Sequence, residues 1–109
     1  MSTLAAMRER LETEQAQIQA EIEKLDRRLN VKPDYSLGTG DPAVYQWELN
    51  LALREQSHGK LKEIRQALSR ISGGSYGKCS RCGGPIESER LELLPSTDVC
   101  STCAARKSR

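Results

Sequence analysis

The sequence predicts a mainly α-helical protein, in which a long antiparallel coiled-coil hairpin carries a small C-terminal C4 zinc finger with a short β-hairpin and a short helix. Two segments of about 30 residues have helical spacing of apolar side chains, and four cysteines near the C-terminus form two C-x2-C pairs. The 109 residues include one Trp, three Tyr and no Phe, which is too few aromatic residues for an ordinary compact core.

The first helical segment begins after a cap at Ser2 or Thr3 and is stopped by Pro33, which disfavours helical geometry in the residue before it. Its apolar residues recur every seven positions, with a second set in the alternate seam position: Leu4, Leu11, Ile18 and Leu25, then Ile22 and Leu29. Arg8 and Gln15 occupy that alternate position nearer the N-terminus, so the seam is expected to be loose there.

The second helical segment is expected to run from Pro42 to Ser72, because Asp41 is a good N-cap before Pro42 and Gly73-Gly74 ends the pattern. Its expected apolar stripe consists of Val44, Trp47, Leu51, Leu61, Ile64, Leu68 and Ile71. Two helices of equal length joined by a short turn-rich segment predict an antiparallel hairpin over residues 1–72, with its tip at residues 33–45.

The four cysteines lie in two pairs, Cys79 with Cys82 and Cys100 with Cys103, separated by 17 residues. Four thiolates at this spacing suit tetrahedral Zn²⁺, and because sulfur fills every ligand position, one structural zinc ion is expected. Two disulfides would fit a secreted protein and a redox C-x-x-C would fit a βαβ unit, and the sequence indicates neither setting. We therefore predict a zinc-finger module over residues 73–109.

Between the two cysteine pairs, residues 85–93 include Ile86, Leu91 and Leu93, enough apolar side chains for a small β-hairpin over the metal. A short helix is expected to begin at the second cysteine pair and to continue to Arg106.

The charge distribution argues against a protein whose main role is to bind nucleic acid. The chain has 17 basic and 15 acidic residues, and its only basic cluster is the short tail Arg106, Lys107 and Arg109. A DNA-binding surface needs a concentrated basic patch, so no sequence-specific DNA binding is expected. No apolar run is long enough to span a membrane, and the N-terminus lacks the apolar stretch of a signal peptide. We expect a cytoplasmic, monomeric protein.

The finger resembles the C4 zinc finger of the DksA/TraR family. The resemblance is carried by Tyr76-Gly77-Lys78-Cys79, Cys82-Gly83, Ile86, Arg90-Leu91, Pro95 and the pair Cys100 and Cys103, and by the Asp41-Pro42 start of the second helix at a coiled-coil tip. The resemblance implies a protein that binds bacterial RNA polymerase directly, inserts its coiled-coil tip through the secondary channel and alters transcription initiation, often together with the alarmone ppGpp.

Between Lys32 and Arg54 there is no basic residue, whereas acidic and aromatic side chains gather there: Asp34, Asp41, Glu48, Tyr35, Tyr45 and Trp47. An acidic, aromatic tip suits a basic, metal-bearing channel, and Asp41, Asp34, Tyr45 and Trp47 are the candidate polymerase-facing residues. The alternative is that the aromatic side chains hold the turn together and that Asp41 is only an N-cap.

Two departures from the family pattern concern function. The family's tip typically has a second acidic residue three positions after the first and an Ala two positions beyond, where this chain has Val44 and Gln46. The basic residues that ppGpp-responsive members use correspond here to Gln56, Gly59, Glu63, Leu94 and Ala104, with only Arg90 retained. Weak or absent ppGpp binding is therefore expected.

These observations favour a zinc-binding transcription regulator that acts through RNA polymerase. One alternative is a DNA-binding zinc finger, and another is a structural protein whose hairpin pairs with a second hairpin. An enzyme is not expected, because no nucleophile, general base or open metal site is evident.

Overall fold

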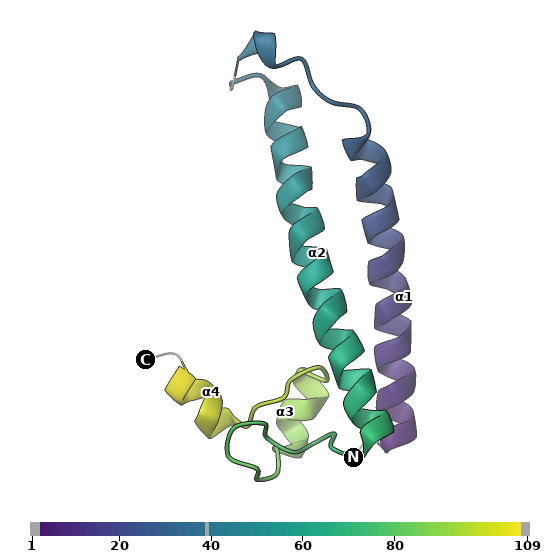
Figure 1. Cartoon of the computed structure of the whole chain (residues 1–109), viewed down its shortest axis with the longest axis vertical. Helices are drawn as coiled ribbons and strands as arrows, with labels where there is room; N and C mark the ends of the chain where they lie inside the picture. Colours follow the sequence, from purple (N-terminus) through teal and green to yellow (C-terminus); the bar gives the residue numbers. More distant parts are fainter. Residues whose placement is uncertain (1–2, 39, 108–109) are drawn as a thin grey trace. The chain divides into compact units, whose positions relative to one another are not determined.

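The computed structural model describes residues 3–38 and 40–107 (Figure 1). In chain order the elements are α1 (Leu4–Leu29), the 3-10 turn η1 (Tyr35–Leu37), α2 (Pro42–Gly73), α3 (Ser88–Leu93) and α4 (Ser101–Lys107). In this described part there is no β-sheet, and one isolated antiparallel bridge pairs Lys78 with Pro85. The mainly α-helical fold class predicted from the sequence is confirmed.

The short β-hairpin expected over residues 85–93 is wrong. Strand pairing in this segment is limited to the single bridge at Pro85, and Ser88–Leu93 forms α3, with Glu87 as the residue before its first turn. The segment consists largely of Glu, Arg and Leu, which favour helix, and it lacks the alternation of a half-buried strand. As a result, Leu93 is 79% exposed.

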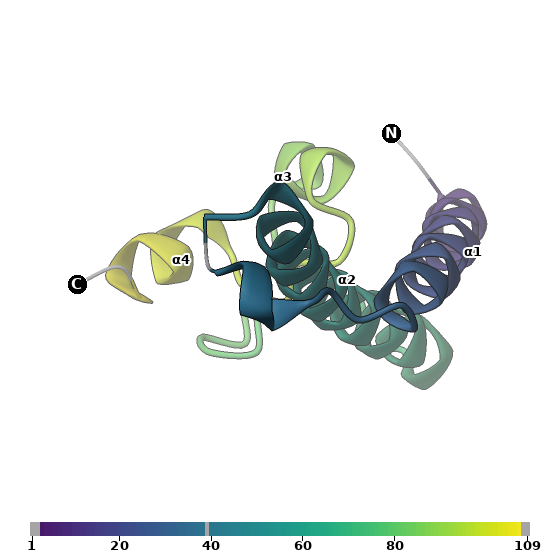
Figure 2. The same ribbon diagram turned by 90° about the horizontal axis from the view of Figure 1, so that it is seen from above.

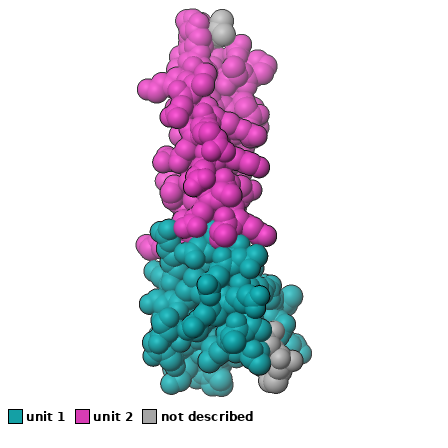
Figure 3. All heavy atoms as spheres, turned by 90° about the vertical axis from the view of Figure 1, so that its right-hand side faces the viewer, with its two compact units in different colours: residues 1–15, 63–109 teal, residues 16–62 magenta. Residues whose placement is uncertain are grey.

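The chain divides into two compact units, coloured separately in Figure 3. Unit 1 contains residues 1–15 and 63–109, and unit 2 contains residues 16–62. Each unit therefore includes a piece of α1 and a piece of α2. The separation into a hairpin domain and a finger domain at residue 72 stays a prediction.

In unit 2, the α1 and α2 segments run antiparallel and are joined by the segment that contains η1, which Figure 2 shows from above. The buried apolar side chains are Ile22, Leu25, Val44 and Leu61. The expected α2 stripe is wrong at one position, because Asn50 is 5% exposed and Leu51 is 38% exposed. The amide oxygen of Asn50 accepts a 3.1 Å hydrogen bond from Nε2 of Gln46, which satisfies this buried polar group in part.

In unit 1, the first turns of α1 pack against the last turns of α2 through Met7, Leu11, Ile64, Ala67 and Ile71, all of which are buried. Met7 occupies the seam where Arg8 was expected, because Met7 is 4% exposed and Arg8 is exposed. The two helix segments thus have an apolar contact beside the finger. Over the described residues, neither long helix contains an apolar stretch that could cross a membrane.

Candidate metal centre and hairpin tip

The sulfur atoms of the four cysteines converge on one point in unit 1. All four lie within 4.8 Å of one another, and the Sγ atoms of Cys82 and Cys100 are 3.8 Å apart. A tetrahedral zinc ion with Zn–S bonds of about 2.3 Å requires sulfur atoms about 3.8 Å apart, whereas a disulfide requires about 2.05 Å. The donor set and its geometry fit one Zn²⁺ ion, and four sulfur ligands leave no open coordination position. The zinc is therefore structural.

The first cysteine pair is held in a tight backbone knuckle. The N–H of Cys79 donates to the carbonyl of Gly84 at 2.7 Å, and the N–H of Gly83 donates to the carbonyl of Cys79 at 3.0 Å. Gly83 has φ of 76°, a conformation that residues with a Cβ rarely adopt. The glycine at this position thus lets the chain turn back so that Cys79 and Cys82 face the same centre.

The second cysteine pair is positioned by α4 and by a carboxylate from the other half of the finger. Cys100 precedes α4 and Cys103 lies in its first turn. The carboxylate of Glu87 accepts hydrogen bonds from the N–H of Ser101 at 3.2 Å and from its hydroxyl at 2.9 Å. These bonds lower the pKa of Glu87, and the carboxylate caps the helix that carries the second pair.

The thiols of Cys79 and Cys103 differ in how easily they lose a proton. Hydrogen bonds from the backbone of Cys82 and Cys100 lower the pKa of the Cys79 thiol to about 6. Hydrogen bonds with the side chains of Cys100 and Cys79 raise the pKa of Cys103 to about 12. The Cys79 thiolate therefore forms near neutral pH, whereas the Cys103 thiolate needs a cation to stabilise it, which a zinc ion supplies.

Three side chains attach the loop at residues 95–99 to the rest of unit 1. The hydroxyl of Tyr76 donates to the carbonyl of Pro95 at 2.7 Å. Nη2 of Arg70, in the last turn of α2, donates to the carbonyls of Ser96 and Thr97 at 3.2 and 3.3 Å. Nε of Arg90 donates to the carbonyl of Val99 at 2.9 Å. These bonds satisfy loop carbonyls that have no helix or sheet partner, so they fix the segment that leads into the second cysteine pair.

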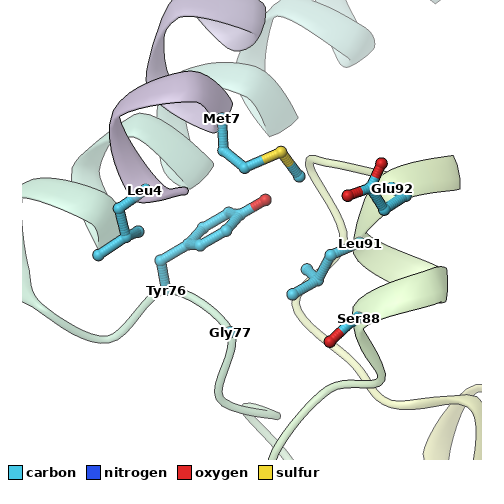
Figure 4. Close-up of a pocket in the computed structure, with 7 residues that line it drawn as sticks. All are labelled: Leu4, Met7, Tyr76, Gly77, Ser88, Leu91 and Glu92. Atoms are coloured by element: carbon cyan, nitrogen blue, oxygen red, sulfur yellow. The ribbon is translucent and has the colours of Figure 1, made fainter. Parts of the chain in front are cut away.

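The start of α1 also contacts the finger. Nη1 of Arg10 donates to the backbone carbonyl of Glu92 at 2.7 Å. Figure 4 shows Leu4 and Met7 of α1 around the ring of Tyr76, with Leu91 of α3 on the other side. These residues line a pocket of about 220 Å³. Sequence reasoning did not identify Arg10 or Arg70, because a bond from a side chain to a distant carbonyl leaves no pattern in the sequence.

At the tip of unit 2, Asp34 has a local structural role. Its Oδ1 accepts hydrogen bonds from the N–H and the hydroxyl of Ser36, at 3.0 and 2.6 Å, and it caps η1. These bonds lower the pKa of the Asp34 carboxyl. The side chain of Asp34 is exposed, and Oδ2 makes no hydrogen bond with the described residues.

Asp41 starts α2 as the sequence predicts. Its Oδ1 accepts a 2.8 Å hydrogen bond from the N–H of Ala43, and its backbone carbonyl accepts one from Tyr45. Val44, where the family's tip typically has a second acid, is 0% exposed. The position is therefore part of the core of unit 2 in this chain, and an acidic side chain could be buried there only at a large desolvation cost.

The three aromatic residues of the tip have different surroundings. The rings of Tyr35 and Trp47 meet edge to face, with centroids 6.1 Å apart, and Nε1 of Trp47 donates to the carbonyl of Leu29 at 3.4 Å. Trp47 thus joins the end of α1 to the start of α2. Tyr45 is 66% exposed. The turn-holding role that the sequence left open fits Tyr35 and Trp47, whereas Tyr45 is available to a partner.

Comparison with known proteins identifies the finger. Residues 74–109 match the family model described as the prokaryotic dksA/traR C4-type zinc finger. An RNA polymerase-binding transcription factor DksA from Buchnera aphidicola is 32% identical over 98 residues, which cover 85% of this chain and 63% of the relative. The protein of that name from Caulobacter vibrioides is 36% identical over 61 residues, which cover 56% of this chain and 43% of the relative. The chain therefore spans less than two thirds of the length of these relatives.

Solved structures extend the likeness to the helices. Transcription factor DksA2 from Pseudomonas aeruginosa matches with a TM-score of 0.82 and 28% identity, covering 96% of this chain and 82% of that one. The DnaK suppressor protein from Agrobacterium tumefaciens shares the fold, with a TM-score of 0.66 and 24% identity over 97% of this chain and 95% of that one. The four converging cysteines and the matching family model show that residues 74–109 form a zinc finger of the prokaryotic dksA/traR C4 type, and the chain is similar in fold to DksA2.

Proposed function

We propose that this protein is a transcription regulator that binds bacterial RNA polymerase directly and modulates transcription initiation. The observation that carries the proposal is the likeness to DksA2 over 96% of the chain, at a TM-score of 0.82. The relatives named as RNA polymerase-binding transcription factors add support. Such a protein would act by binding rather than by catalysis, in the cytoplasm and as a monomer, without reading a DNA sequence itself.

The tip of unit 2 is the proposed polymerase-facing element, and it would reach the enzyme through the secondary channel. Asp41 and Asp34 each use one carboxylate oxygen for a local cap, which leaves the second oxygen available to a cation. Tyr45 offers an exposed ring beside them, and Trp47 holds the turn in place. A negatively charged tip is complementary to a basic, metal-bearing channel. With Val44 buried, Asp41 is the acid on which the effect of the tip would depend.

The proposal is tested by measuring the affinity of the zinc-loaded protein for core RNA polymerase, with and without a known secondary-channel competitor. We expect saturable binding that the competitor displaces. An Asp41→Asn variant, which keeps a capping side chain, is expected to reduce the effect on initiation. Glu55→Gln, an exposed acid of α2 outside the tip, serves as the matched control.

Two results would contradict the proposal. Absence of binding at tens of micromolar would leave pairing with a second hairpin as the better account of the fold. Binding to duplex DNA with a steep salt dependence, together with no affinity for polymerase, would favour the DNA-binding alternative.

A further inference from the structure

Each cysteine pair of the finger has a serine directly after its first cysteine. Ser80 follows Cys79, and Ser101 follows Cys100. Neither serine is needed as a metal ligand, because four sulfur atoms already complete a tetrahedral site. The hydroxyl of each serine instead donates a hydrogen bond to a carboxylate that lies elsewhere in the finger. The two serines therefore have a partner in common type, although they belong to different cysteine pairs.

The first of these contacts joins the two halves of the finger, which we define as residues 76–87 and residues 95–103. The N–H of Ser80 donates to the backbone carbonyl of Asp98 at 2.8 Å, and its hydroxyl donates to Oδ2 of Asp98 at 3.2 Å. Asp98 lies two residues before Cys100. The contact, which we call a clasp, therefore ties the first cysteine pair to the chain that leads into the second.

The second clasp joins the same halves in the opposite direction. The carboxylate of Glu87, in the first half, accepts hydrogen bonds from the N–H of Ser101 at 3.2 Å and from its hydroxyl at 2.9 Å. Glu87 is held in the first half through its neighbour Ile86, whose N–H donates to the carbonyl of Gly77 at 2.8 Å. Each half thus contributes one serine and one carboxylate to the contact with the other half.

The four sulfur ligands differ in their exposure. Cys82 is exposed, whereas Cys79, Cys100 and Cys103 are buried. A competing chelator can approach a bound metal ion from the side of Cys82, but the three buried ligands become accessible only when the two halves move apart. Because the buried ligands come from both cysteine pairs, this movement must break the clasps. The strength of the clasps should therefore control how fast a metal ion is lost.

We propose that Ser80 and Ser101 are positioning residues that hold the two halves of the finger together and so slow the loss of zinc. They act through Asp98 and Glu87 and not on the metal itself. Hydrogen bonds to a carboxylate are stronger than those between neutral groups, which makes each clasp an effective restraint. The inference goes beyond the proposed function, because it concerns metal retention and does not require polymerase as a partner.

The experiment measures how fast the zinc-loaded full chain transfers its metal to an excess of the chromogenic chelator pyridylazoresorcinol. Ser80→Ala and Ser101→Ala each remove one hydroxyl donor, and each is expected to lose zinc about fivefold faster than the unmodified protein. Ser101→Thr keeps a hydroxyl and should restore the slow rate. In a Glu87→Ala background, Ser101→Ala should have no further effect, because the acceptor is already absent.

Ser88→Ala is the matched control. Ser88 is an exposed serine of the finger whose hydroxyl makes no hydrogen bond with any residue that the structure describes. Its rate of zinc loss should lie within about twofold of that of the unmodified protein. Zinc loss from Ser80→Ala and Ser101→Ala at the rate of this control would overturn the inference. Loss from Ser101→Thr as fast as from Ser101→Ala would also overturn it.

A second readout separates positioning from a change in the ligand set. The absorption spectrum of bound Co²⁺ depends on the type and geometry of its ligands. We expect cobalt-loaded Ser80→Ala and Ser101→Ala to keep the spectrum of the unmodified protein, because all four thiolates remain. An altered spectrum would contradict the inference, since the serines would then determine how the cysteines coordinate the metal and not how fast the halves separate.

Discussion

The hydroxyl of Tyr76 donates a 2.7 Å hydrogen bond to the backbone carbonyl of Pro95, and so joins the start of the finger to the loop before its second cysteine pair. Burial raises the pKa of this phenol, which keeps it protonated and able to donate. Arg70 donates to the next two carbonyls of the same loop. Within unit 1, the folding of the finger is thereby coupled to the end of α2.

Replacing Tyr76 by Phe removes only this hydroxyl. The carbonyl of Pro95 loses its donor, and we expect the free energy of unfolding of the zinc-loaded protein to fall by about 1 kcal/mol. Urea denaturation followed by circular dichroism measures it. Tyr45→Phe is the matched control, because Tyr45 is 66% exposed, and a change of less than about 0.5 kcal/mol is expected there. Equal effects of the two substitutions would contradict a role for the Tyr76 bond.

Zinc removal is expected to unfold the finger. Binding of structural zinc contributes about 10–16 kcal/mol in isolated finger peptides, far more than the small apolar cluster of Ile86, Leu91 and Val99 around the cysteines can supply. A chelator, or a Cys79→Ser substitution, should abolish α3 and α4 in the circular dichroism spectrum and release the ends of α1 and α2 in unit 1. Retained zinc and an unchanged melting curve in Cys79→Ser would refute the bracing role of the metal.

The cap at Asp34 predicts a pH-dependent change at the tip. Hydrogen bonds from Ser36 hold the pKa of this carboxyl below its ordinary value of 3.8. Because the folded state has the lower pKa, the cap stabilises the tip at neutral pH, and this contribution is lost as the pH falls through the lowered pKa. Fluorescence of Trp47, the only Trp of the chain, is expected to report the loss, since its ring contacts Tyr35.

Asp34→Asn provides the control for this titration, since an amide can still accept the bonds but does not ionise. The acid step in the fluorescence of Trp47 should be absent from this variant. An identical step in both proteins would assign the change to another group.

Gly59 lies in the interior of α2, and nothing lies within 4 Å of the position that a Cβ would occupy. Gly59→Ala is therefore expected to raise the free energy of unfolding by about 1 kcal/mol. Gly38→Ala should do the opposite, because Gly38 has φ of 91°. Thermal melting of the two variants tests whether Gly59→Ala raises and Gly38→Ala lowers the stability. A destabilised Gly59→Ala variant would indicate a local departure from helical geometry.

A weak response to ppGpp is expected. Arg90 is the one basic residue retained at the positions that responsive family members use, and its Nε already donates to the carbonyl of Val99. Titrating ppGpp into the complex with core polymerase should leave the affinity for the protein unchanged, in contrast to a responsive relative measured alongside. Tight ppGpp-dependent binding would show that other side chains form the site.

Strong local signals made most of the architecture predictable from the sequence. Asp41 and Pro42 mark the start of α2 correctly, and its end at Gly73 is one residue from the expected Ser72. The end of α1 was harder to predict from the sequence. Pro33 only requires the helix to stop before it, whereas α1 ends at Leu29, whose carbonyl bonds to Trp47. That contact exists only once the two segments are folded together.

The buried side of α2 differs from the apolar stripe expected from the sequence at the position where a polar residue, Asn50, is buried instead of the neighbouring leucine. Near the tip, Val44 and Asn50 are buried while Leu51 is 38% exposed. Positions 44, 47 and 50, which are buried or half-buried, are three residues apart, and because three residues are less than a full helical turn, the buried side shifts gradually around α2. The periodicity of leucines could not reveal this, since the buried position holds an amide that depends on Gln46 for its hydrogen bond. The zinc site was predictable because the ligand spacing is local, whereas the finger's attachment through Arg70 required the tertiary fold.

The most direct test of the account places a photoreactive phenylalanine analogue at the position of Tyr45, the exposed ring of the tip. If the tip enters the secondary channel, this protein should crosslink to polymerase segments near the active centre, and a secondary-channel competitor should abolish the crosslink. The same analogue at the exposed Arg81 of the finger serves as the comparison. Crosslinks from position 81 alone, or crosslinks from position 45 that persist with the competitor present, would contradict the account.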